Sequence, residues 1–186
     1  DNTATIPQSS YGVQKALGEL LVNDYSRRGF VNGRVVRLPT IVVRPGQPNR
    51  APPTFASSII REPLQGQTAL CPVSPELRLW VMSPRRAVQN LIHAAELPAD
   101  AWGDNRIVSL PGLTVSVQQM IESLARVAGA EAVSLIKWQP DPSIENIVGS
   151  WPARFNPERA VTLGFEADTS FDEIVRAFME DELQKQ

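Results

Sequence analysis

The feature that most constrains the fold is an alternation of short runs rich in β-branched residues with longer segments that have the apolar spacing of a helix. Strands are expected at residues 35–38, 41–43, 68–73, 77–82, 105–110 and 132–138. Helices are expected at residues 11–28, 54–64, 84–96 and 117–127, with two or three more that end at 171–183. Strands that alternate with helices predict an α/β architecture.

The composition is that of a folded globular protein. The chain has 186 residues, of which 42% are hydrophobic and 20% charged, so wholesale disorder is excluded and one or two domains are expected. Eighteen basic and twenty acidic side chains give a net charge of −2. A domain that neutralises nucleic-acid phosphates has a basic excess, so no nucleic-acid partner is expected.

Cysteine and histidine are each present once, as Cys71 and His93. No intrachain disulfide and no closed zinc site can be built from them, and such usage is typical of a cytoplasmic enzyme. No apolar run approaches the roughly 20 residues that a membrane helix needs, so no membrane partner is expected. The first methionine is Met82, and the chain opens at Asp1 in what reads as the middle of a fold, so we expect a fragment.

The most specific signal is the pair Tyr11 and Lys15 on the helix expected at 11–28. Ser9 and Ser10 precede this helix as N-cap candidates and Gly29 follows it. Residues four apart are separated by about 40° of rotation, so the two side chains lie on one face. A nearby ammonium stabilises the phenolate, and such a tyrosine can exchange a proton with a substrate hydroxyl or carbonyl. The alternative is a tyrosine that packs at a helix start beside a solvated lysine.

The context of this pair resembles the extended short-chain dehydrogenase/reductase family, of the NAD-dependent epimerase/dehydratase type. The resemblance is carried by SSYGVQKALGELLVNDYSRRG and, after it, VVRLPTIVVRPG. It continues through RLWVMSPRRAVQNLIHAAE and NRIVSLPGLTVSVQQMIESLARVAG to the closing segment WPARFNPERAVTLGFEADTSFDEIVRAFMED. Four landmarks in the family's order cover nearly the whole chain.

The resemblance implies the C-terminal portion of a Rossmann-type doubly wound sheet plus a small α/β substrate-binding lobe. Residues 1–50 would complete the dinucleotide-binding domain, and residues 51–186 would form mainly the lobe, with some segments returning to the Rossmann domain. It also implies that Tyr11 is the acid/base, that Lys15 lowers the proton affinity of Tyr11 and hydrogen-bonds the nicotinamide ribose, that Pro39 faces the cofactor and that Thr40 faces the substrate.

The family's glycine-rich turn is missing, because no GxGxxG-like run occurs in the chain. We therefore expect that part of the nucleotide site to precede Asp1, and we expect this chain alone neither to bind NAD properly nor to turn over. The residue that separates NAD from NADP belongs to the same missing part, so the sequence leaves both open.

Ser83, Pro84, Arg85 and Arg86 stand where the family usually has acidic residues. Two guanidinium groups reverse the local charge and can hold a carboxylate or phosphate, so a small anionic substrate is expected, with Ser83, Arg85, Arg86 and Arg44 as its candidate ligands. The alternative is that one or both of these two arginines pair with helix carbonyls or surface acids.

Within the family, the pattern most resembles the branch that oxidises the C2 hydroxyl of a D-erythronate-like sugar acid to a 2-oxo acid. A nucleotide-sugar epimerase or dehydratase remains the alternative enzyme, and a non-catalytic binding protein of the same fold is the alternative from another class. Family members also often pair through the tyrosine helix, which implies a homodimer through residues 11–28; the same apolar residues could instead line the sheet.

The remaining conspicuous side chains are given structural roles. His93 is expected to be a structural or surface histidine, and Trp80 to pack in the core. Cys71 is expected to pack as a small apolar group, with a position facing the substrate left open. No role is predicted for Trp138 and Trp151 beyond covering a cleft.

Overall fold

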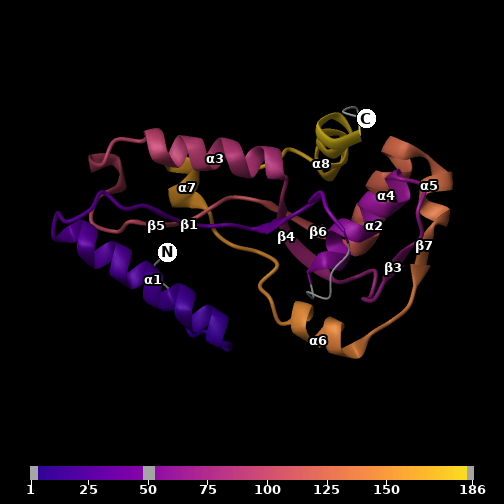
Figure 1. The fold of residues 1–186 in the computed structure, drawn as a ribbon, viewed down its shortest axis with the longest axis horizontal. Helices are drawn as coiled ribbons and strands as arrows, with labels where there is room; N and C mark the ends of the chain where they lie inside the picture. The colour runs from indigo at the N-terminus through magenta and orange to yellow at the C-terminus, as the bar shows by residue number, and fades with distance from the viewer. Residues whose placement is uncertain (1–3, 48–52, 184–186) are drawn as a thin grey trace. The chain divides into compact units, whose positions relative to one another are not determined.

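The computed structural model describes residues 4–47 and 53–183, which divide into two compact units (Figure 1). The first unit comprises Asp1–Leu38, Val88–Pro111 and Pro157–Glu166. The second comprises Pro39–Ala87, Gly112–Asn156 and Ala167–Gln186. Each unit is therefore assembled from three separate stretches of sequence. The first boundary between the two units lies between Leu38 and Pro39. Which unit serves the cofactor and which the substrate stays a prediction.

The first unit is built around a pair of parallel strands. Strand β1 (Val35–Arg37) pairs with β5 (Ile107–Ser109), with Val35 opposite Ile107. The unit also contains α1 (Ser10–Arg27), the short 3-10 turn η1 (Asp100–Trp102), α7 (Glu158–Thr162) and most of α3 (Pro84–Glu96). Its buried side chains include Trp102, Val108, Leu110 and Phe165.

Helix α1 begins and ends one residue before the predicted bounds of 11–28, and of the two N-cap candidates Ser9 is the cap while Ser10 is the first helical residue. The Ser9 hydroxyl accepts a hydrogen bond from the Gly12 N–H at 3.1 Å, and Gly29 after the helix has φ of 75°, a conformation that glycine adopts without strain. The Arg37 guanidinium donates two hydrogen bonds to the Glu19 carboxylate, at 2.8 and 2.6 Å, and so ties the helix to β1. Of the residues of α1, all of which the structure describes, only Ser26 is buried.

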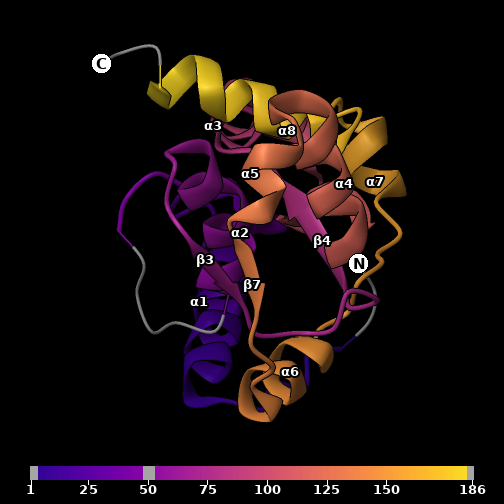
Figure 2. The same ribbon diagram turned by 90° about the vertical axis from the view of Figure 1, so that its right-hand side faces the viewer.

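The second unit contains two small sheets. Strands β2 (Thr40–Ile41), β4 (Arg78–Met82) and β6 (Leu113–Ser116) form one sheet in the order β2-β4-β6, with β2 parallel and β6 antiparallel to β4. The other pairs β3 (Ala69–Cys71) with β7 (Ile136–Trp138) in parallel, and the two lie side by side in Figure 2. The helices are α2 (Thr54–Leu64), α4 (Val117–Ala128), α5 (Ala130–Ser134), α6 (Pro142–Gly149) and α8 (Phe171–Phe178), which continues into the π turn η2 (Met179–Leu183).

A single hydrophobic core fills the second unit. Helix α2 packs against β3 and α4, and α4 packs against α8. The most deeply buried side chains of this core include Ile59, Ile60, Val81, Met120, Leu124 and Ile174. Every residue of α2 from Thr54 to Pro63 is buried, so this helix is enclosed by the rest of its unit.

The α/β architecture predicted from the sequence is confirmed, including the exact bounds of α2 and α3. The strand expected at residues 132–138 is wrong in its first half, which forms α5. Gly129 ends α4 with φ of 86°, after which Ala130, Glu131 and Ala132 favour a new helical turn, and the strand begins only at Ile136. Strand β6 was missed, because its four residues directly follow Pro111 and Gly112 and the last of them, Ser116, is also the N-cap of α4.

Two features, a membrane-spanning helix and a metal-binding cluster, are absent from the residues that the structure describes. None of their helices is long and apolar enough to cross a membrane. Nor do any three histidine, cysteine or acidic side chains among them gather into a group that could bind a metal ion, so no metal role is assigned.

Candidate active site

The first candidate group is the Tyr11–Lys15 pair on the exposed side of α1. The Lys15 Nζ lies over the Tyr11 ring, 5.4 Å from its centroid, and the tyrosine is 70% exposed. No carboxylate within residues 4–47 and 53–183 pairs with Lys15. The ammonium is therefore close to the phenol and still has hydrogen-bond donors available for a ligand.

Pro39, Thr40 and Arg44 lie on the segment that contains β2. Thr40 is half-buried and stands opposite Val81 of β4, while Pro39 is buried. A Cβ on Gly112 would lie 3.0 Å from the Pro39 Cγ, so a glycine is needed for this close approach. The segment is thus fixed in the second unit by strand pairing and by packing.

Arg44 is the first exposed residue after the buried Val42 and Val43. Its backbone is held by two residues of α2, Ser57 and Arg61. In the described part of the chain, the Arg44 guanidinium has no hydrogen-bond or ion-pair partner. This arginine is consequently available to an anion from solution.

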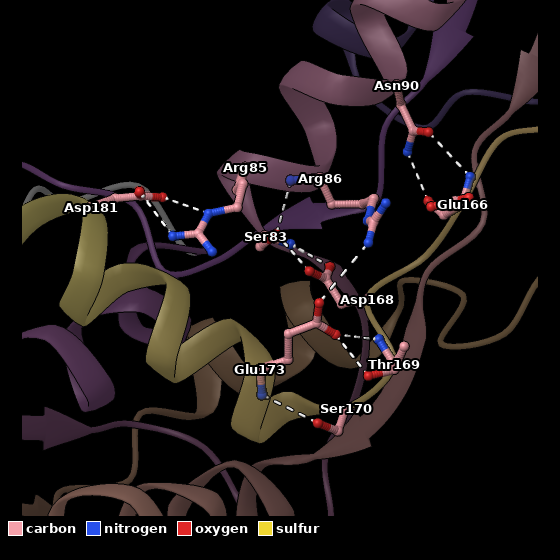
Figure 3. A network of polar contacts seen from close by, with 10 residues as sticks. All are labelled: Ser83, Arg85, Arg86, Asn90, Glu166, Asp168, Thr169, Ser170, Glu173 and Asp181. Atoms are coloured by element: carbon pink, nitrogen blue, oxygen red, sulfur yellow. Dashed lines mark hydrogen bonds and ion pairs between the residues drawn. The ribbon is translucent and has the colours of Figure 1, made fainter.

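Ser83, expected among the substrate ligands, is instead buried and fully engaged. Its hydroxyl donates to Asp168 Oδ1 at 2.6 Å, and its N–H donates to Asp168 Oδ2 at 2.8 Å (Figure 3). The same hydroxyl accepts a hydrogen bond from the Arg86 N–H at 3.0 Å, which caps the first turn of α3. With 1% exposure, Ser83 has the surroundings of a structural residue.

Arg85 and Arg86 are paired with acidic side chains of α8 and η2, which was the alternative to substrate binding. Arg85 binds Asp181 through Nε at 3.0 Å and Nη2 at 2.9 Å (Figure 3), and it also binds Glu180 through Nη2 at 2.8 Å. These two carboxylates raise the pKa of the Arg85 guanidinium above its usual range. The Arg86 Nη2 lies 3.9 Å from Glu173 Oε1. The positive charges of Arg85 and Arg86 are thus balanced by carboxylates of the protein itself.

The structural roles expected for the single histidine and cysteine agree with their surroundings. His93 Nε2 lies 2.8 Å from the Leu163 carbonyl oxygen, and its ring meets Phe165 edge-on. Cys71 is fully buried, and burial raises the pKa of its thiol to about 11, so the group is a neutral thiol near pH 7.

The tryptophans differ in their surroundings. Trp80 packs against Phe155 at a centroid distance of 5.8 Å. Trp138 and Trp151 are 46% and 37% exposed, so neither belongs to the core.

The predicted site residues therefore fall into two groups. Tyr11 and Lys15 meet in the first unit, while the second unit contains the others, namely Pro39, Thr40, Arg44, Ser83, Arg85 and Arg86. The sequence did not single out Ser57 and Arg61, which hold Arg44. Nothing in the sequence marked Ser57, and the only signal for Arg61 was its opposite charge to the adjacent Glu62 within the helix expected at residues 54–64.

Comparison with known proteins identifies similar dehydrogenases. The chain is 60% identical over 181 residues, 97% of its length, to a D-erythronate dehydrogenase of Cupriavidus necator, and 52% identical over 180 residues to one of Haemophilus influenzae. It spans 56% and 57% of the lengths of these two relatives. No family model matches the chain.

Solved structures share the fold. A crystal structure from Agrobacterium tumefaciens, described as a nucleoside-diphosphate-sugar epimerase, matches with a TM-score of 0.96 and 48% identity, covering all of this chain and 54% of that one. An L-threonine 3-dehydrogenase of Trypanosoma brucei matches with a TM-score of 0.84 at 23% identity, covering 97% and 55% of the two chains, and supports the fold alone. The predicted resemblance to epimerase/dehydratase-type short-chain dehydrogenases is confirmed. By sequence and fold, the chain is a relative of the D-erythronate dehydrogenases that matches a little over half of their length.

Proposed function

We propose that the full-length protein is an NAD-dependent oxidoreductase that oxidises the C2 hydroxyl of a small, D-erythronate-like sugar acid to a 2-oxo acid. The observation that carries the proposal is the Lys15 ammonium over the Tyr11 ring on an exposed helix face. The identity of 60% to a D-erythronate dehydrogenase supports the choice of substrate class.

Tyr11 is the proton acceptor in this proposal. In its phenolate form, Tyr11 takes the proton of the C2 hydroxyl as the carbonyl forms. A bound nicotinamide dinucleotide would supply the hydride acceptor for this oxidation. Lys15 fits such a cofactor because its ammonium is exposed and can donate to a ribose hydroxyl, and Pro39 is the candidate for a contact with the nicotinamide. NADP in place of NAD is an outcome that the assay distinguishes.

Arg44 is the proposed anchor for the substrate carboxylate. A guanidinium can hold a carboxylate through two parallel hydrogen bonds. Arg85 and Arg86 already face carboxylates of their own unit, whereas Arg44 has an exposed side chain without such a partner among the described residues. Thr40 adds a hydroxyl that can hydrogen-bond the substrate.

A second candidate function is that of a nucleotide-sugar epimerase or dehydratase. The specific observation in its favour is the TM-score of 0.96 to the Agrobacterium tumefaciens structure described as a nucleoside-diphosphate-sugar epimerase. In this reading the Arg44 guanidinium would hold a phosphate rather than a carboxylate.

A homodimer through α1 is part of the proposal. The helix exposes several large apolar side chains, which a second copy could cover, namely Val13, Leu17, Leu20, Leu21 and Tyr25. Sedimentation of the full-length protein should show a dimer that Leu20→Glu weakens, because the substitution places a charge on the apolar face. A dimer unaffected by this change would assign the interface elsewhere.

The decisive test is a substrate panel with the full-length protein. NADH formation is followed by its absorbance with NAD and a set of four-carbon aldonic acids, then with NADP, and conversion of nucleotide sugars is followed in parallel. Oxidation of one acid supports the dehydrogenase. Conversion of a nucleotide sugar with no acid oxidised would contradict it and favour the second candidate.

A further inference from the structure

We propose that Arg61, a buried residue of α2, is a positioning residue that sets where Arg44 presents its guanidinium to the substrate. The inference rests on the proposed function, in which Arg44 is the anion anchor. It concerns the second unit alone, to which both residues belong.

Both backbone polar groups of Arg44 are bound by side chains of one helix. The Arg44 N–H donates to Ser57 Oγ at 3.1 Å, and Arg61 Nη1 donates to the Arg44 carbonyl oxygen at 2.8 Å. Ser57 and Arg61 are four positions apart, so they lie on the same face of α2. Together they fix the peptide groups on both sides of the Arg44 Cα.

Arg61 is itself held rigidly. Its side chain donates from Nη2 to Glu62 Oε1 at 2.6 Å and to Ser58 Oγ at 3.2 Å. Arg61 and Glu62 are 3% and 4% exposed, so the positive charge is balanced in place by its neighbour and has little access to water. Because its partners are internal, this guanidinium is left to hold the Arg44 backbone rather than to bind a ligand.

The position of this backbone determines what the Arg44 side chain can reach. Val42 and Val43 immediately before it are 0% and 1% exposed, so the chain leaves the core at Arg44. A binding group displaced by about 1 Å can cost about 100-fold in rate. A change at Arg61 should therefore alter substrate binding, although Arg61 is too deeply buried to meet the substrate in this structure.

The competing explanation is that Arg61 only stabilises the core through Glu62. The two explanations differ in whether the effect of Arg61 depends on the Arg44 side chain. A double-mutant cycle measures this dependence, because residues that act through one another give non-additive effects.

The experiment uses Arg61→Lys, Ser57→Ala, Arg44→Gln and the two doubles that combine Arg44→Gln with each of the others, all in the full-length protein. KM and kcat are measured with the acid or nucleotide sugar that the wild-type protein converts, together with the KM for NAD and the melting temperature. We expect Arg44→Gln to raise the substrate KM by about 10- to 100-fold, as for a lost hydrogen bond to a charged group. Arg61→Lys keeps the charge but loses the planar fork, so it should raise the substrate KM by about 10-fold with kcat and the KM for NAD nearly unchanged.

In the Arg44→Gln background, Arg61→Lys should add no further increase in KM. An equal increase in both backgrounds would overturn the proposal and leave Arg61 with a structural role only. Should Arg61→Lys not fold, Ser57→Ala answers the same question from the other side of Arg44, since it removes the second backbone contact. Ser58→Ala is the matched control: it removes a bond of Arg61 that does not reach Arg44, and it should leave KM within about twofold of wild type.

Failure of the proposed function gives a different experimental result from failure of the inference about Arg61. If no acid is oxidised but a nucleotide sugar is converted, the wild-type assay shows it, and the cycle is then measured with that substrate. If Arg44→Gln leaves KM unchanged, Arg44 is not the anchor, and this inference is overturned with that assignment.

Discussion

Helices α1 and α2 each carry a pair of neighbouring polar side chains, which is exposed in α1 and buried in α2. In α1, the Lys15 ammonium lies over the Tyr11 ring and both side chains are exposed. In α2, Arg61 and Glu62 form an ion pair of 2.6 Å with both side chains at most 6% exposed. The α1 pair can exchange partners with solvent or a ligand, while the α2 pair is committed to its own unit. In our proposals, the exposed pair takes part in the chemistry and the buried Arg61 positions Arg44.

The physical reason lies in solvation. An exposed charge interacts weakly with its neighbour because water screens both, so little free energy opposes a change of partner. A buried charge has lost its hydration, so removing its partner is costly. The following predictions test this contrast, in order of decreasing expected effect.

The largest effect should follow Tyr11→Phe. Because Tyr11 is the proposed proton acceptor, removing its hydroxyl should lower kcat/KM by about 10²- to 10⁴-fold, the usual contribution of general acid–base catalysis. The melting temperature should not change, because Tyr11 is 70% exposed. Tyr25→Phe on the same helix is the matched control, and an equal loss of activity in both variants would remove the special role of Tyr11.

Next in size is the cost of breaking the buried ion pair. Arg61→Met should lower the free energy of unfolding by about 3–5 kcal/mol, because Glu62 would be left buried without its counter-charge. On α1, Arg27 pairs with Asp24 at 2.6 Å but is 63% exposed, and Arg27→Met should cost less than about 1 kcal/mol. Urea titrations of the full-length protein measure both values, and similar costs would contradict the contrast.

Substitution of an apolar residue should also lower the free energy of unfolding more in α2 than in α1. Ile59 of α2 is fully buried, and Ile59→Ala should cost about 2–5 kcal/mol, including the cavity it leaves. Leu17 of α1 is 56% exposed in a single chain, and Leu17→Ala should change the free energy of unfolding of the monomeric Leu20→Glu variant by no more than about 0.5 kcal/mol. A larger effect at Leu17 in the full-length protein would sharpen the comparison, since it would show that another surface covers α1 there.

The smallest effect concerns pH. The Arg126 guanidinium, with further help from the Ser123 hydroxyl, lowers the pKa of Asp172 to about 2, from about 4 in an unfolded chain. A lowered pKa in the folded state adds stability that is present above pH 4 and is lost as the pH falls from about 4 to about 2. Unfolding titrations over this range should show a steeper decline for the wild-type protein than for Asp172→Asn. Equal slopes would show that this ion pair does not contribute.

Local structure was largely predictable because its signals are local. The bounds of α2 and α3 follow from apolar spacing and from Pro84 at the first position of α3. Strand β6 and the boundary between α5 and β7 were not predicted correctly. Their sequences are too short for periodicity to decide between helix, strand and turn, and pairing with a distant strand settles the outcome.

The sequence by itself determined that Tyr11 and Lys15 lie together, because helix geometry alone brings residues four positions apart onto one face. Only the tertiary structure decided which of the predicted anion ligands, Arg44, Arg85 or Arg86, has a guanidinium without a partner among the described residues. Arg85 meets Asp181, which is 96 positions away in the chain, while Arg44 is held by its backbone and leaves its guanidinium exposed. The partner of a charged side chain depends on which distant segments pack beside it, and no spacing within the local sequence encodes that.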